Sequence, residues 1–79
     1  MARVLLFGPL RDLAGWRERE LSAASLSELR AALGAEDPAL AAALAAPGVQ
    51  VALNQAIVRG DAALPPAAEV AFLPPMSGG

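Results

Sequence analysis

Short runs of branched and aromatic residues stand near both ends of the chain. Residues 3–7 form one run, with apolar side chains on both faces of the predicted strand, and residues 69–73 form another of the same kind. Strands that are apolar on both faces are typical of the middle of a sheet. The pattern therefore predicts two central strands, one from each end of the chain. Residues 10–14 predict a single helical turn after the first of them.

Three shorter strands are predicted beside this pair. Residues 16–21 carry a run of charged side chains, which is typical of a solvated sheet edge. Residues 49–53 alternate apolar and other side chains, and residues 56–58 follow after Asn54-Gln55. Asparagine tolerates positive φ, so these two residues predict a tight turn between antiparallel strands.

The middle of the chain changes to helical spacing. The stretch from Ser25 to Glu28 matches a capping box, and three leucines follow on one helical face. Gly34 is interpreted as the C-terminal stop of this helix. Asp37-Pro38 predicts the start of a second helix, because aspartate caps and proline suits the first helical position. With two leucines among alanines, this helix is expected to lie flat over an edge of the core.

The order strand, strand, helix, helix, strand, strand, strand predicts an α+β fold. Two central helices can cover only one face of a sheet of about five strands. We therefore expect the β-grasp arrangement of ubiquitin, a mixed sheet in which the first and last strands pair at the centre and helices cover one face. The second face would be a partly open apolar docking surface. A crowded small core is the alternative on periodicity alone.

A proline-and-glycine segment follows the last strand: Pro74, Pro75, Met76, Ser77, Gly78 and Gly79. Proline stops sheet pairing and holds the chain extended, and glycines could pass through a narrow tunnel because they lack side chains. The sequence predicts a domain at residues 1–74 and a flexible tail at residues 75–79, whose reactive group is the carboxylate of Gly79. A frayed terminus without a function is the alternative.

Composition narrows the possible functions. The 79 residues include no histidine, cysteine, tyrosine or lysine, so the usual general bases, nucleophiles and soft metal ligands are missing. The formal net charge of −2 argues against a basic nucleic-acid-binding surface and suits a basic cleft on a partner. No apolar run approaches a membrane span and no signal-peptide pattern is present. We expect a cytoplasmic protein that binds neither nucleic acid nor membrane.

The chain resembles the small-subunit family of molybdopterin synthase, often called MoaD, over nearly its whole length. The resemblance rests on residues 4–7, 11–15 and 53–58, and above all on residues 69–79 with their sequence EVAFLPPMSGG. Related thiazole-forming sulfur carriers also end in Gly-Gly but usually lack the aromatic-Pro-Pro step. This sequence departs from the common pattern at residues 65–68, where many relatives have a Gly-Asp turn, and that difference alters a loop only.

The resemblance implies a β-grasp sulfur carrier that binds no cofactor itself. An E1-like adenylating enzyme would use ATP to activate the Gly79 carboxylate, and sulfur from a persulfide would then form a terminal thiocarboxylate. The tail would insert into the large synthase subunit, in a heterotetramer of two small and two large subunits. The expected tail-insertion residues are Pro75, Met76, Ser77 and Gly78, and the expected partner-binding residues are Phe7, Phe72, Leu73 and Pro74.

The expected function is therefore to donate sulfur for dithiolene formation in molybdenum cofactor biosynthesis, as a carrier subunit and not as an enzyme acting alone. Two alternatives stay open at this point. The chain could carry sulfur for another product, such as thiamin thiazole, a thiolated tRNA base or cysteine. It could also be a protein modifier, joined through Gly79 to lysines on target proteins.

Overall fold

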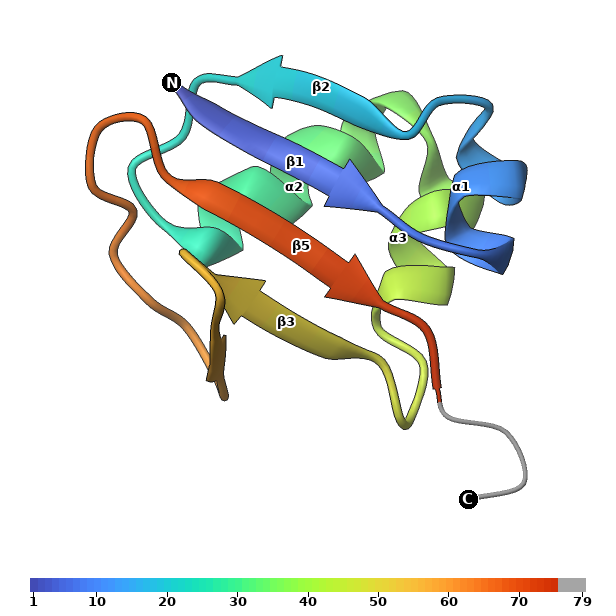
Figure 1. Cartoon of the computed structure of the whole chain (residues 1–79). Coiled ribbons are helices and arrows are strands. Elements are labelled where there is room, and N and C mark those ends of the chain that lie inside the picture. Colours follow the sequence, from blue (N-terminus) through green and yellow to red (C-terminus); the bar gives the residue numbers. More distant parts are fainter. Residues whose placement is uncertain (76–79) are drawn as a thin grey trace.

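The computed structural model describes residues 1–75, as a sheet with helices on one side (Figure 1). Its elements are β1 (Ala2–Leu6), α1 (Pro9–Ala14), β2 (Glu18–Leu21), α2 (Leu26–Glu36), α3 (Pro38–Leu44), β3 (Gln50–Leu53), β4 (Ala56–Val58) and β5 (Glu69–Leu73). All five predicted strands and both predicted helices are present, and the predicted helical turn is α1. None of the helices in the described range is long and apolar enough to cross a membrane.

The two ends of the chain meet at the centre of the sheet. The strand order is β2-β1-β5-β3-β4, with β1 parallel to β5 and the other neighbours antiparallel. The parallel register sets Val4 beside Val70 and Leu6 beside Phe72. This is the predicted β-grasp arrangement, a five-stranded mixed sheet with helices on one face.

The core lies between the sheet and the helices. Its large buried side chains are Val4, Leu6, Leu10, Leu26, Leu29, Leu33, Leu40, Leu44, Val51, Val70 and Phe72. Figure 1 shows α2 and α3 behind the sheet. The helix α3 contributes more than predicted, since Leu40 and Leu44 are only 1% and 2% exposed. It packs against α2 and α1 instead of lying flat over an edge, and burying each leucine stabilises the fold by about 1.5–3 kcal/mol.

The start of α2 uses the predicted capping box with one change. The Ser25 Oγ accepts a hydrogen bond from the Glu28 N–H at 3.2 Å, as predicted. The Glu28 carboxylate, however, accepts from the Ala24 N–H at 3.3 Å and not from the N–H of Ser25. Asp61 adds a third contact, because its carboxylate accepts from the Ser27 N–H at 2.9 Å. These bonds fix the loop before β5 to the first turn of α2.

The prediction for Gly34 is wrong. The helix α2 continues through Gly34 to Glu36 and ends at Asp37, whose side chain accepts from the Leu40 N–H at 3.1 Å and caps α3 as predicted. A Cβ at position 34 would lie 3.3 Å from the Cβ of Ala41. The glycine therefore permits the close approach of α2 and α3, a role that helical spacing alone does not reveal.

The tight turn between β3 and β4 is confirmed. Asn54 and Gln55 have φ values of 49° and 71°, in the left-handed region that a two-residue hairpin turn needs. The Asn54 side chain also accepts a hydrogen bond from the Glu69 N–H at 2.9 Å. That bond ties the hairpin to the start of β5.

Candidate functional site

The face of the sheet that carries no helix within residues 1–75 is the candidate site. Because side chains alternate along each strand, the strand registers place on it Arg3, Leu5, Glu18, Glu20, Gln50, Ala52, Ile57, Glu69, Ala71 and Leu73. We call this set the open face. Leu5, Ala71, Ala52 and Ile57 stand in one row across four strands. Ile57 is 50% exposed, Leu5 is half-buried, and the two alanines between them are only 6% and 9% exposed. An apolar row of this kind on a solvated sheet face is typical of a protein-docking surface.

Three of the four predicted partner-binding residues gather at one end of the open face. Phe7 follows β1 and is 45% exposed, while Leu73 and Pro74, at the end of β5, are half-buried. The expectation that apolar area near these strand ends stays uncovered is therefore confirmed, and the crowded-core alternative is wrong. Their contact with a partner stays a prediction.

The assignment of Phe72 to the partner-binding set is wrong. Its side chain is 0% exposed and lies on the helix side of the sheet, beside Leu6 of β1 and Val51 of β3. The Arg30 guanidinium stands 5.2 Å from the centre of its ring. Phe72 therefore holds the core together and cannot reach a partner across the open face.

Gly8 and Gly48 pack against the two prolines that lead into the tail, and we call these two glycines the tail seat. A Cβ at Gly8 would lie 3.5 Å from the Pro74 ring, and a Cβ at Gly48 would lie 3.0 Å from the Cβ of Pro75. Both glycines have positive φ, 56° and 89°, which disfavours other residues. Their contact with the tail depends on which prolines fold against them, and no local signal in the sequence predicts it.

Pro75 is exposed and is the last residue described. The other predicted tail residues, Met76, Ser77, Gly78 and Gly79, lie outside the described residues. Their roles in tail insertion and sulfur transfer stay predictions.

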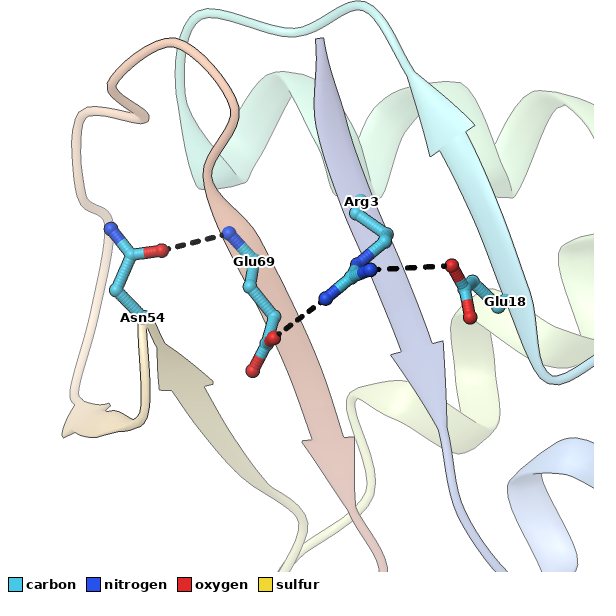
Figure 2. A network of polar contacts seen from close by, with 4 residues as sticks. All are labelled: Arg3, Glu18, Asn54 and Glu69. Carbon is cyan, nitrogen blue, oxygen red and sulfur yellow. Dashed lines mark hydrogen bonds and ion pairs between the residues drawn. The ribbon is translucent and has the colours of Figure 1, made fainter.

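The opposite end of the open face is polar and carries a net negative charge, because Glu18, Glu20 and Glu69 outnumber Arg3 there. Figure 2 shows Arg3 between two carboxylates, with distances of 3.0 Å to Glu69 and 3.6 Å to Glu18. These side chains are solvated, so the pairs add little stability. The open face is thus divided into a charged end and an apolar end, and the tail leaves from the apolar end.

The shifted pKa values among the described residues arise from contacts that stabilise the fold. A hydrogen bond from the Arg19 guanidinium holds the pKa of Glu36 below its usual range, and the pair joins β2 to α2. Hydrogen bonds from the Ser27 and Ala62 backbone N–H groups and from the Ser27 hydroxyl lower the pKa of Asp61. Across residues 1–75 there is no group of three or more histidine, cysteine or acidic residues placed to hold a metal ion. The chemistry that this geometry supports is docking, with the tail presented at one edge.

The whole chain has relatives among known proteins. A curated relative, the molybdopterin synthase sulfur carrier subunit of Escherichia coli, is 36% identical over 81 residues, and the alignment covers 100% of each chain. Among solved structures, the small archaeal modifier protein 1 of Methanosarcina acetivorans matches with a TM-score of 0.87 at 26% identity, covering 99% of this chain and 95% of that one. Its counterpart from Haloferax volcanii matches at 0.83 and 25% identity, covering 99% and 98%.

A third solved structure is a complex. The complex of subunits 1 and 2 of the molybdopterin-converting factor from Helicobacter pylori contains a chain that matches with a TM-score of 0.73 at 25% identity, covering 99% of this chain and 97% of that one. The sequence also matches the model of the ThiS family over residues 4–79. Since that match includes both central strands, the helices and the tail, the chain belongs to the ThiS family.

Proposed function

We propose that this chain is the sulfur carrier subunit of a molybdopterin synthase, which carries sulfur as a thiocarboxylate on Gly79. The observation that carries the proposal is its full-length similarity, at 36% identity, to the Escherichia coli protein of that name. The open face supports it, because a carrier must dock on other proteins and present its tail to them.

The chemistry begins at a carboxylate, which is unreactive until one oxygen becomes a good leaving group. An adenylating enzyme would transfer AMP from ATP to the Gly79 carboxylate and release pyrophosphate. The terminal sulfur of a persulfide donor would then displace AMP and form an acyl disulfide with Gly79. A thiol would cleave the S–S bond of that intermediate, leaving a thiocarboxylate on Gly79 and a disulfide on the donor side, so that one difficult step is divided into easier ones. The bases and nucleophiles for these steps would come from the partners. ATP is thus used by the activating enzyme and is not bound by this chain.

The large synthase subunit is the proposed recipient. The complex of two subunits from Helicobacter pylori supports a partner of this kind, because one chain of that complex has the same fold as this protein. Phe7, Leu73 and Pro74 would be buried against that subunit, and residues 75–78 would lead Gly79 to the pterin precursor. Two sulfur transfers complete a dithiolene, which accords with two small and two large subunits in one assembly. We propose the cytoplasm, where ATP is available, as the compartment.

Intact mass spectrometry of the protein purified from its own cells tests the carrier state. A form heavier by the difference between one sulfur and one oxygen atom is expected, and it should disappear when the gene for the adenylating enzyme is deleted. That form, mixed with the large subunit and the pterin precursor, should yield molybdopterin. Failure to form molybdopterin from a verified thiocarboxylate would contradict the synthase assignment and leave a carrier for another pathway.

Protein modification is the second candidate, and the similarity to two proteins named small archaeal modifier protein 1 favours it. Both functions would begin with the acyl-adenylate and differ in the nucleophile that attacks it. In a modifier the nucleophile is a lysine amine, so Gly79 would be found in isopeptide bonds on other proteins. Abundant conjugates without any thiocarboxylate would replace the carrier assignment with this one.

A further inference from the structure

A groove lies beside the point where the tail leaves the domain. It has a volume of about 320 Å³, and its lining includes Gly48, Gln50, Ile57, Arg30 and Arg59. Figure 1 shows the start of β3 near the end of β5, and the register pairs Gln50 with Leu73. Pro75 packs against Gly48 at the same corner. The groove therefore borders both the tail seat and the open face.

Two arginines give this groove a positive charge. Arg30 is fixed in place, because its guanidinium stands 5.2 Å from the Phe72 ring centre and donates one hydrogen bond, at 3.4 Å, to the Leu44 carbonyl. No buried side-chain nitrogen or oxygen in residues 1–75 lacks a hydrogen-bond partner, so Nε and Nη2 of Arg30, which make no hydrogen bond in that range, are not buried. Arg59 is exposed at the end of β4. Both can donate to a ligand in the groove.

Neither arginine is neutralised within residues 1–75. Arg3 and Arg19 each have a carboxylate at 3.0 Å, whereas Arg30 and Arg59 make no ion pair in that range. A smaller hollow of about 190 Å³ shares Arg30 and leads to Asp61. The Asp61 carboxylate is held by three hydrogen bonds, two from Ser27 and one from the Ala62 N–H, and it makes no ion pair with Arg30 within residues 1–75. The lining of the groove itself thus has two arginines and no acidic residue, in a protein with a formal net charge of −2.

We propose that the groove between Arg30 and Arg59 receives an aspartate or glutamate side chain of the protein that encloses the tail. This inference rests on the proposed function, in which a partner surrounds the chain beyond Pro75. Such a partner must cover the adjoining groove, and covering unpaired guanidinium groups is costly unless they find an anion. A carboxylate fits, because guanidinium groups bind it with paired hydrogen bonds. The carboxylate then orients the partner so that the tail enters in one direction only.

Loss and reversal of the charge at Arg59 test the inference, with Ser22→Glu as the matched control. Ser22 is also exposed, and Ser22→Glu lowers the net charge by one, as Arg59→Gln does, but Ser22 follows β2 at the end of the sheet opposite the tail. Binding to the purified large subunit from the same organism is measured by isothermal titration calorimetry. Arg59→Glu should weaken binding at least about tenfold and Arg59→Gln about fivefold, while Ser22→Glu should stay within about twofold. Arg30→Lys, which keeps the charge but loses the planar fork, should also weaken binding.

The outcomes distinguish a failure of this inference from a failure of the proposed function on which it rests. A wild-type chain that fails to bind the large subunit contradicts the proposed function, and the inference falls with it. A wild-type chain that binds, with Arg59→Glu binding equally well, contradicts the groove alone. Equal weakening by Arg59→Gln and Ser22→Glu indicates general electrostatics and also overturns it. If inorganic phosphate shifts the NMR signals of Arg59 while Arg59→Glu leaves the affinity for the partner unchanged, the groove binds a small anion instead. Recovery of Arg59→Glu binding by an acidic-to-arginine substitution in the large subunit identifies the partner residue.

Discussion

The two phenylalanines of this chain test whether core residues and partner-binding residues are separate sets. Phe7 and Phe72 are both predicted from sequence to contact a partner, yet Phe7 is 45% exposed and Phe72 is 0% exposed. Replacing each by alanine should therefore affect different properties. Phe72→Ala should act on stability, whereas Phe7→Ala should act mainly on partner binding.

The magnitudes follow from burial. Removing a buried phenylalanine costs about 3–5 kcal/mol, which corresponds to a fall of roughly 12 °C or more in Tm for a domain of this size. Phe7 can lose only its exposed 45% on binding, and 0.45 of the full transfer value of about 1.5–3 kcal/mol is about 0.7–1.4 kcal/mol. That free energy corresponds to a loss in affinity of about three- to tenfold. It is an upper estimate because ordering the interface opposes binding.

Thermal unfolding and calorimetric titration with the large subunit measure the two effects separately. If Phe72→Ala does not fold, Phe72→Leu keeps a large apolar side chain in the core and gives a smaller change of the same sign. The reasoning fails if Phe7→Ala binds the partner as well as the wild type while a folded Phe72 variant binds more weakly without losing stability.

Three further predictions concern the tail and one loop. Gly48→Ala should lower the free energy of unfolding by about 1–2 kcal/mol because of the φ of 89°, and it should also slow sulfur transfer because the new Cβ would lie 3.0 Å from Pro75. Its control is Gly15→Ala, which has a φ of 84° and nothing within 4 Å and should therefore lower stability alone. Equal transfer rates in the two variants would count against the tail seat. Adding one alanine after Gly79 should abolish thiocarboxylate formation in an assay with the adenylating enzyme and leave Tm unchanged, and a product with this variant would contradict the proposed reacting group. Because hydrogen bonds lower the pKa of Asp61 in the folded state, its contribution to stability is present above its unfolded pKa and is lost as the pH falls through the folded value. Asp61→Asn should therefore reduce the fall of Tm at acidic pH. An unchanged dependence of Tm on pH would show that these bonds contribute nothing.

Local chemistry was enough to determine the elements and the central pairing. A capping serine, a proline at the first helical position and an asparagine turn each act within a few residues, so Ser25, Asp37 and Asn54 could be read directly. The apolar pattern on both faces of the first and last strands was enough to predict their pairing, because only a central strand needs it. The family resemblance, carried by residues 69–79, pointed to sulfur carriage before any geometry was known.

Tertiary structure alone decided which side chains are available for function. Strand alternation separates Phe72 from Leu73, but it does not say which face the helices cover, and that choice makes one a core residue and leaves the other at the open face. Gly34 and Gly48 carry no local sign that Ala41 and Pro75 will fold against them. The pairing of arginines is likewise non-local: Arg3 and Arg19 meet carboxylates from distant elements, while Arg30 and Arg59 meet none within residues 1–75. Such contacts depend on how separate elements approach one another in space, and a sequence pattern with a period of a few residues does not encode that approach.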